Sequence, residues 1–216
     1  LSEERAASLV TALAVAPGGH VVDLGCGWAE LLLRVVGAHP GTTGVGVDND
    51  RAALDRARGE VARRGLHERV ELVEADAATF EDHADVVLCV GSTHAFGGAT
   101  EALRDIRRIV APGGLVLFGD GFWERPPGAE ARALFGELPV LDGLVSVARS
   151  IGYAVERAER STLDEWDAFE ATWRSGLERA EDPDARLLAV EREQRYRDSY
   201  RGVLGFGWLV LRAPLG

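Results

Sequence analysis

Lysine and methionine are both absent from this sequence of 216 residues, and it holds only two cysteines. Without lysine, the chain has no residue for Schiff-base chemistry or for a lysine general base. All 24 basic residues are therefore arginine, a bias that we attribute to coding rather than to function. Cys26 and Cys89 lie in apolar stretches without metal-ligand spacing, which predicts reduced core thiols in a cytoplasmic protein.

Long apolar runs are also missing, since no stretch approaches the roughly 20 residues that span a bilayer. The start of the chain is acidic and helix-like, unlike a signal peptide, and without an initiator methionine the sequence leaves open whether it was trimmed. The net charge of −11 disfavours a phosphate backbone or an anionic membrane. We expect a small-molecule partner, no nucleic acid, no membrane, and a monomer or homodimer.

What is present is a soluble, globular composition, with 46% hydrophobic and 27% charged residues. Short apolar strands are expected at residues 21–22, 44–48, 70–74, 85–90, 115–119, 153–157 and 205–211. Helical patterns are expected at residues 2–15, from 29 onward, and at 51–65, 100–110, 129–136, 141–151, 163–180 and 184–200. This alternation predicts a parallel sheet covered on both faces, closed by an antiparallel hairpin whose connection is a helical cap.

Ligands of such sheets lie at the carboxyl ends of the strands, so the loops after Val22, Val47, Val73, Val90 and Phe118 are the places to search. The first of these loops is a glycine turn, residues 23–27. Glycine lets the backbone turn sharply and approach a ligand closely. An acid at position 23 argues against a pyrophosphate and for a ligand that carries a cation.

Several motifs follow in a fixed order: Val22-Asp23-Leu24-Gly25-Cys26-Gly27, Gly46-Val47-Asp48, Glu74-Ala75-Asp76-Ala77, Asp85-Val86-Val87 and Ala111-Pro112-Gly113-Gly114. Over residues 20–120 this set resembles the class I S-adenosylmethionine-dependent methyltransferases. Glu30 and residues 91–98, 123–127 and 204–208 extend the similarity to a subgroup of small bacterial methyltransferases of largely unassigned substrate.

The resemblance implies an α/β, Rossmann-like, doubly wound sheet of seven mostly parallel strands in the order 3-2-1-4-5-7-6, with a helical cap between the last two strands. We expect a single domain, residues 1–216. It would comprise an N-terminal helix (1–19), a cofactor-binding core (20–120), the C-terminal half of the sheet (121–160 and 203–216) and the inserted cap (161–202).

The resemblance also implies methyl transfer to an oxygen, nitrogen or carbon of a small molecule, with S-adenosyl-L-methionine as cofactor and S-adenosyl-L-homocysteine as its product. The residues implied in cofactor binding are Asp23, Gly25, Cys26, Gly27, Glu30, Asp48, Asn49, Asp76, Ala77, Val90 and Gly91.

Three of these residues, Asp48, Asp76 and Glu30, also have a purely structural interpretation. Asp48 would accept hydrogen bonds from both ribose hydroxyls, or it caps the next helix, a role that Asp50 fits better. Asp76 would accept from the adenine amino group, or it is a loop acid or helix cap. Glu30 faces the ligands, or it is simply an acid favoured by the helix dipole.

One departure from the family pattern is visible, because Ala29 stands where its third glycine is expected; we expect only slight crowding there.

His94, just past the fourth strand, is the candidate general base, unless it is only hydrogen-bonded in its loop. Asp120 and Glu124, expected after the fifth strand, complete the candidate catalytic set.

The acceptor pocket is expected to include His94, Phe96, Trp123, Tyr196 and Tyr200. The alternative for Trp123 is a core residue that fills the space between sheet and cap. Most cap aromatics are expected to pack the cap on the sheet. The remaining histidines are isolated from one another, so no metal site is predicted.

Two rival functions remain at this point. A nicotinamide-dependent oxidoreductase shares the glycine turn, but predicts a full Gly-x-Gly-x-x-Gly and a catalytic Tyr/Lys pair. A non-catalytic cofactor-binding or partner-binding module predicts a pocket without polar groups beyond Val90, where His94, Asp120 and Glu124 stand.

Overall fold

The computed structural model describes residues 1–178 and 183–215. The first half holds α1 (Glu3–Leu13), β1 (His20–Leu24), α2 (Glu30–Ala38), β2 (Thr43–Asp48), α3 (Arg51–Arg63), β3 (Val70–Glu74), the 3₁₀ turn η1 (Ala77–Thr79), β4 (Ala84–Val90), the 3₁₀ turn η2 (Thr93–Phe96) and α4 (Ala99–Ile109). The second half holds β5 (Val110–Trp123), α5 (Ala129–Phe135), α6 (Leu141–Ser150), β6 (Ala154–Arg160), α7 (Leu163–Glu178), α8 (Pro183–Arg195), the π-type turn η3 (Tyr196–Tyr200) and β7 (Leu204–Arg212).

The strands form one seven-stranded sheet in the order β3-β2-β1-β4-β5-β7-β6. Strands β1 to β5 are mutually parallel, whereas β7 runs antiparallel to both β5 and β6. The predicted fold class and strand order are therefore confirmed.

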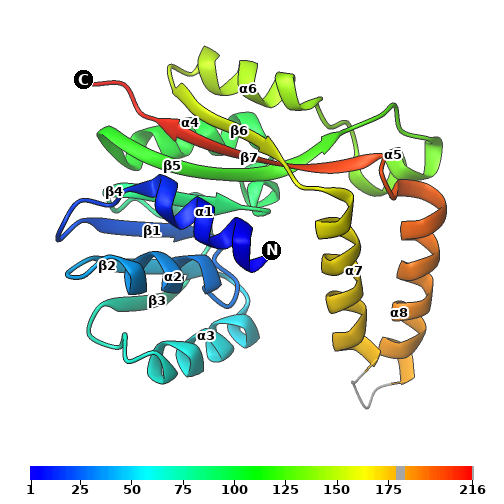
Figure 1. The fold of residues 1–216 in the computed structure, drawn as a ribbon, viewed down its shortest axis with the longest axis horizontal. Coiled ribbons are helices and arrows are strands. Elements are labelled where there is room, and N and C mark those ends of the chain that lie inside the picture. Colours follow the sequence, from blue (N-terminus) through cyan, green and yellow to red (C-terminus); the bar gives the residue numbers. More distant parts are fainter. Residues whose placement is uncertain (179–182, 216) are drawn as a thin grey trace.

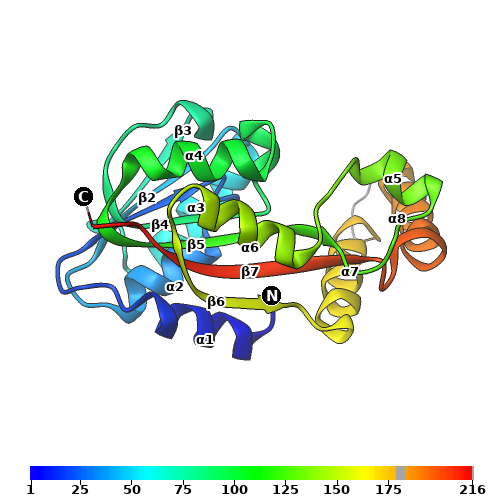
Figure 2. The ribbon, with the colours of Figure 1, turned by 90° about the horizontal axis from the view of Figure 1, so that it is seen from above.

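Helices cover both faces of this sheet (Figure 2), with α1 and α2 on one face and α4 and α6 on the other. The apolar residues separate accordingly into two core clusters. One contains Leu9, Leu32 and Val61 from the α1–α3 side, and the other contains Ile106 and Leu144 from α4 and α6. This burial on both faces explains why the central strands read as continuous apolar runs.

Helix starts follow local capping chemistry. The Ser2 hydroxyl accepts a hydrogen bond from the backbone N–H of Arg5, and Ser2 thereby caps α1. Asp50 caps α3, because its carboxylate accepts from the N–H groups of Ala52 and Ala53. The capping role considered for Asp48 thus belongs to Asp50.

The fifth strand is longer than the predicted residues 115–119. It pairs with β7 from Leu115 opposite Arg212 to Trp123 opposite Leu204. Asp120 and Trp123 therefore lie on the strand itself, and only Glu124 follows it. The sequence hid this extension because glycines interrupt the strand pattern, and they lie directly opposite aromatic residues of the partner strand.

Helices α7 and α8 form an antiparallel hairpin between β6 and β7 that projects away from the sheet (Figure 1). We call this hairpin, with η3, the cap. The predicted helices at 163–180 and 184–200 correspond to α7 and to α8 with η3; residues 179–182 lie outside the described residues.

Candidate functional site

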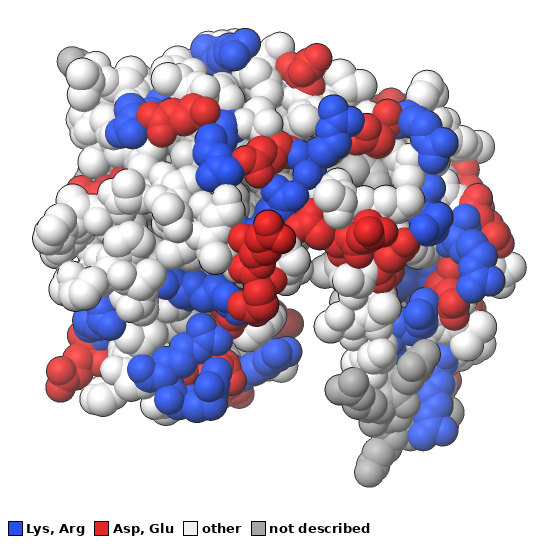
Figure 3. Space-filling view, viewed as in Figure 1, with Lys and Arg blue, Asp and Glu red and all other residues white. Residues whose placement is uncertain are grey.

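The carboxyl ends of the parallel strands point toward the cap, because β5 runs in the same direction and continues into it. Helix α7 stands opposite this edge of the sheet (Figure 1). Figure 3 shows the surface hollowed between the core and the cap, with acidic side chains gathered at the top of the hollow. We call this hollow the cleft.

The glycine turn uses most of its own backbone donors. The N–H groups of Gly25 and Cys26 both donate to the carbonyl of Val47, at 2.8 and 3.0 Å, and that of Ala29 donates to the carbonyl of Cys26 at 2.8 Å. The N–H of Gly27 donates to the Asp48 carboxylate. Since these donors are occupied, the turn is poorly suited to cradle a pyrophosphate.

Both glycines of this turn have positive φ, +73° at Gly25 and +54° at Gly27. The space available for a side chain differs between the two positions. A Cβ at position 25 would lie 2.3 Å from the Cβ of Ser92, whose hydroxyl donates to the Leu24 carbonyl at 2.6 Å. A Cβ at position 27 would meet nothing within 4 Å. Gly25 therefore lets the loop after β4 pack closely, and Gly27 lies on the open side.

Ala29 caps α2 in the left-handed conformation, with φ of 61° and ψ of 24°. Its side chain is fully buried among apolar neighbours of α2 and β1. The expectation of slight crowding therefore misidentified the constraint. The replacement of glycine by alanine at position 29 instead causes backbone strain, because the left-handed conformation is unfavourable for alanine and not for glycine.

Asp23 and Asp48 place two carboxylates at the carboxyl ends of β1 and β2. Burial, with a smaller contribution from the Asp48 charge, raises the pKa of Asp23 to about 7. No basic side chain in the described chain contributes to this shift. Asp48 accepts from Gly27 N–H at 2.7 Å and from Asp50 N–H at 2.8 Å. This pair would be stabilised by a cation placed beside it.

The remaining cofactor candidates lie along the same edge. Asn49 is exposed between β2 and α3, and Asp76 follows β3, where its carboxylate also caps η1 through Ala78 N–H at 3.0 Å. Ala77 is buried beside it. Val90 ends β4, and Gly91 has a φ of +72° with open space around it.

Two of the candidate residues are directed elsewhere. The Cys26 thiol points toward Gly46, where a Cβ would lie 2.9 Å from its Sγ, and burial raises its pKa well above the usual range. The Glu30 carboxylate pairs with Arg34 at 2.6 Å and with Arg64. These ion pairs connect the start of α2 to the end of α3. Contact of Glu30 with the cofactor stays a prediction.

The structure places His94 and Asp120 near each other and Glu124 elsewhere, at the base of the cap. His94 is exposed on η2. Asp120 lies near it on β5, accepting from the Thr93 hydroxyl at 2.9 Å and from Gly121 N–H at 2.8 Å. Burial raises the pKa of Asp120, and the hydrogen bonds from Thr93 and Gly121, with a smaller contribution from the charge of His94, partly offset that rise. Glu124 instead pairs with Arg160 at the base of the cap.

Most predicted pocket aromatics are buried. Phe96 belongs to the core cluster under α4, while Trp123, Tyr196 and Tyr200 pack together where the cap meets the sheet. The Tyr196 hydroxyl donates to Asp167 at 2.7 Å and that of Tyr200 lies 3.3 Å from Glu170. In this structure both tyrosines pack within the cap, and their contact with the acceptor stays a prediction.

Two aromatic residues outside the predicted pocket set also lie near this edge of the sheet or on the cap. Phe206 lies over Gly119 of β5, which pairs with Val90 at the end of β4, and Phe169 is 44% exposed on α7. The alternation Gly205-Phe206-Gly207-Trp208 was the available signal, because glycine beside an aromatic ring in a strand marks a place where the ring lies on the neighbouring backbone. Trp28, in the glycine turn, is 36% exposed under the Arg56 guanidinium.

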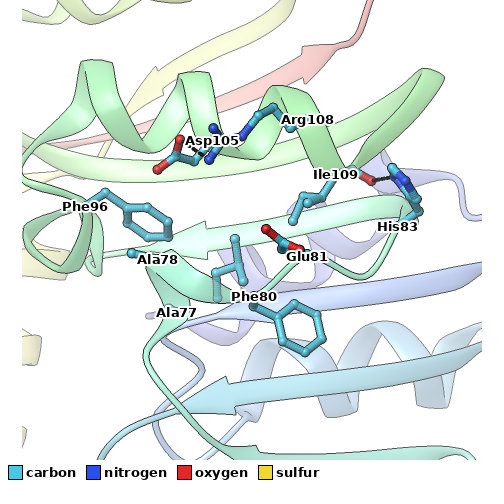
Figure 4. A pocket seen from close by; sticks show the side chains of 10 residues that line it. Ala77, Ala78, Phe80, Glu81, His83, Phe96, Asp105, Arg108 and Ile109 are labelled. Atoms are coloured by element: carbon cyan, nitrogen blue, oxygen red, sulfur yellow. Dashed lines mark hydrogen bonds and ion pairs between the residues drawn. The ribbon is translucent and has the colours of Figure 1, made fainter.

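A separate cavity of about 300 Å³ opens beside α4 (Figure 4). Phe96, Phe80 and Ile109 form part of its apolar wall, and Asp105 and Arg108 stand at its side as an ion pair. It exists because only the short η1, and no full helix, connects β3 to β4. Leu24, from the glycine turn, and Ala77 are also among its lining residues.

Across residues 1–178 and 183–215, no three histidine, cysteine or acidic side chains come together as a metal site. Within the same described ranges, no helix is long and apolar enough to cross a membrane. Cys26 and Cys89 are free thiols, the second fully buried.

Comparison with known proteins agrees with this geometry. The family model described as a methyltransferase domain matches residues 22–116. The protein YjhP of Escherichia coli is 32% identical, over 98% of this chain and 92% of that protein.

Two solved structures, both described as S-adenosylmethionine-dependent methyltransferases in complex with S-adenosyl-L-homocysteine, share the fold. The protein from Geobacter sulfurreducens has a TM-score of 0.89 and 28% identity, covering 98% of this chain and 91% of its own. The protein from Thiobacillus denitrificans has a TM-score of 0.83 and 27% identity, covering 99% and 92%.

Proposed function

The chain belongs to the class I S-adenosylmethionine-dependent methyltransferases, and we propose that it methylates a small molecule bound in the cleft. The position of α7 opposite the carboxyl ends of the strands supports this most directly, because the cap closes off one side of the cleft. The net charge of −11 further disfavours a nucleic acid as acceptor.

The edge of the sheet fits the cofactor chemically. Asp23 is a buried carboxylate with no basic partner in the described chain, so the ammonium and sulfonium charges of the methionine end would complement it. Asp48 is fixed by two backbone donors and keeps acceptor capacity for the ribose hydroxyls. Asp76 and Ala77 would bound the adenine.

When bound, S-adenosylmethionine supplies a methyl group that leaves its sulfur as the bond to the acceptor forms. Much of the acceleration of such a displacement comes from alignment, which supplies about 7–11 kcal/mol in favourable cases. The protein's part is to hold the acceptor in line from the cap side of the cleft.

We assign His94 the role of proton acceptor for an acceptor atom that must lose a proton. It is exposed just past β4, and histidine is the side chain that most often serves as a general base. Asp120, held by Thr93 and Gly121, lies close enough for its charge to be affected by His94 and would stabilise the imidazolium. Glu124, paired with Arg160, would keep the base of the cap in place.

The acceptor class is tested by following S-adenosyl-L-homocysteine formation with a cell extract separated by size. We expect the small-molecule fraction, freed of protein and nucleic acid, to support turnover. Turnover only with the macromolecular fraction would refute a small-molecule acceptor.

The role of His94 is tested separately with His94→Ala. Loss of a general base should lower turnover about 100-fold to 10,000-fold, with the dissociation constant of S-adenosyl-L-homocysteine unchanged. An unchanged turnover number would make His94 a loop residue only.

A further inference from the structure

A row of aromatic rings runs from the cofactor edge into the cap. Phe206 lies over the backbone of β5, since a Cβ on Gly119 would be 2.8 Å from its Cε1 and 3.0 Å from Cγ1 of Val90. Val90 is the last residue of β4 and a candidate cofactor contact. The glycine at position 119 is thus required for this ring to reach the end of β4.

The row continues onto α7. The ring centroids of Phe206 and Trp166 are 6.4 Å apart with planes at 76°, and those of Trp166 and Phe169 are 5.7 Å apart at 82°. We call Phe206, Trp166 and Phe169 the aromatic strip. Its far end is accessible, because Phe169 is 44% exposed.

The strip carries one polar group without a partner. The indole N–H of Trp166 is buried and makes no hydrogen bond, whereas that of the neighbouring Trp208 donates to the Ser161 hydroxyl at 2.8 Å. A buried donor without an acceptor is unfavourable, so a ligand oxygen that reached it would be bound well. The strip therefore offers apolar ring faces, and within it lies one buried donor that lacks an acceptor.

Among the described residues, the cap part of the strip has few unpaired carboxylates beside it that could balance a positive charge on a ligand. The acids of α7 nearest the strip are already paired with arginines: Glu165 with Arg5, Asp167 with Arg201 and Glu170 with Arg192. Within residues 165–170, which carry the cap part of the strip, these pairs neutralise the carboxylates that an amine would otherwise meet. This arrangement disfavours an amine acceptor and favours a neutral one.

We propose that the methyl acceptor is a hydroxylated aromatic ring compound, whose ring packs on the aromatic strip and whose hydroxyl oxygen is methylated. The proposal rests on the proposed function, because it places the acceptor beside the cofactor edge. The hydroxyl proton is the one that passes to His94. Aromatic rings favour offset or edge-to-face packing on one another, which the tilted rings of the strip provide.

Binding is measured by saturation-transfer NMR on the protein loaded with S-adenosyl-L-homocysteine. Catechol serves as the aromatic probe, cyclohexane-1,2-diol as its saturated counterpart and ethanolamine as the amine. We expect catechol to bind best. Catechol binding no better than the diol, or weaker than ethanolamine, overturns the proposal. Failure of S-adenosyl-L-homocysteine to bind at all would instead overturn the proposed cofactor site.

Two variants locate the binding. Phe206→Leu and Phe169→Leu should each weaken catechol binding about fivefold to tenfold, with the affinity for S-adenosyl-L-homocysteine unchanged. Phe169 is exposed, so its variant is expected to fold even if Phe206→Leu does not. The matched control is Phe135→Leu, a 36% exposed ring that contacts Trp123 and Tyr200 away from the strip. Equal effects in Phe169→Leu and Phe135→Leu would contradict the proposal.

Discussion

The backbone N–H of Gly27 donates a hydrogen bond of 2.7 Å to the carboxylate of Asp48, 21 residues further along the chain. This bond joins the glycine turn after β1 to the acid that ends β2. The acid expected to hold the ribose is therefore oriented by the turn expected to hold the methionine end. Such preorganisation lowers the entropic penalty of binding.

Replacement of Asp48 by asparagine should weaken binding of S-adenosyl-L-homocysteine about 10-fold to 100-fold, because hydrogen bonds to a charged group contribute about 1.5–3 kcal/mol. Titration calorimetry measures this directly. Asp50→Asn is the matched control, since asparagine caps a helix as well as aspartate does. Similar losses in the two variants would show that the effect comes from the start of α3 instead.

The stability of the ligand-free protein should depend on Asp23. Its pKa is raised to about 7 in the folded state, from about 3.8 when unfolded, so the folded state binds the proton more tightly. The resulting stabilisation is complete below pH 3.8 and is lost as the pH rises to about 7, by at most about 4 kcal/mol. Thermal melting between about pH 5 and about pH 8 measures the decline.

A cationic ligand prefers the ionised carboxylate, so stabilisation by S-adenosylmethionine should grow over the same pH interval. Asp23→Asn should remove both trends. If that variant kept the wild-type dependence on pH, another group would be responsible for it.

Ala29→Gly should raise the free energy of unfolding by about 1 kcal/mol, because the left-handed conformation strains alanine but not glycine. Ala14→Gly, with a φ of 38° after α1, should stabilise similarly without touching the site. Ala12→Gly, inside α1, should instead destabilise by about 1 kcal/mol. Urea unfolding compares the three variants, and destabilisation by Ala29→Gly would show that the lost methyl contacts outweigh the relieved strain.

Arg5 ties the N-terminal helix to the base of the cap. It pairs with Glu159 of β6 at 2.7 Å and with Glu165 of α7 at 2.8 Å, and only 14% of its side chain is exposed. Hydrogen bonding from Arg5 is the main reason that the pKa of Glu165 falls to about 2.

We expect Arg5→Met to lower the free energy of unfolding at neutral pH by about 1–2 kcal/mol, since it leaves partly buried carboxylates unpaired. The contribution of Glu165 is present above pH 4.5 and is lost as the pH falls toward 2, so the variant should also lose part of this acid sensitivity. Arg132→Met, which breaks an exposed pair with Glu137, should cost at most about 0.5 kcal/mol. Chemical unfolding measures both variants. Equal losses in the free energy of unfolding would show that Arg5 contributes no more than an exposed ion pair does.

The core of the fold could be predicted because its signals are local. Apolar strands, the caps at Ser2 and Asp50 and the ordered motifs each depend on a few neighbouring residues. The length of β5 could not be predicted in this way. Its extension to Trp123 depends on pairing with β7, and the glycines that permit that pairing look like turn residues in the sequence.

The positions of the candidate site residues could be predicted where the backbone fixes them. Asp23, Asp48 and Asp76 all lie at strand ends, as the motif order required. The burial of the cap aromatics could not be predicted, because they repeat at helical spacing and the sequence does not distinguish buried from exposed ones. Tyr196 and Tyr200 are buried in the cap, while Phe169 faces solvent.

The most direct measurement is a crystal structure of the protein with S-adenosyl-L-homocysteine. We predict the ribose at Asp48, the amino group of the methionine end near Asp23, and the sulfur facing the cleft between His94 and Phe206. The same ligand seated elsewhere, such as in the cavity beside α4, with Asp23 and Asp48 untouched, would contradict this account.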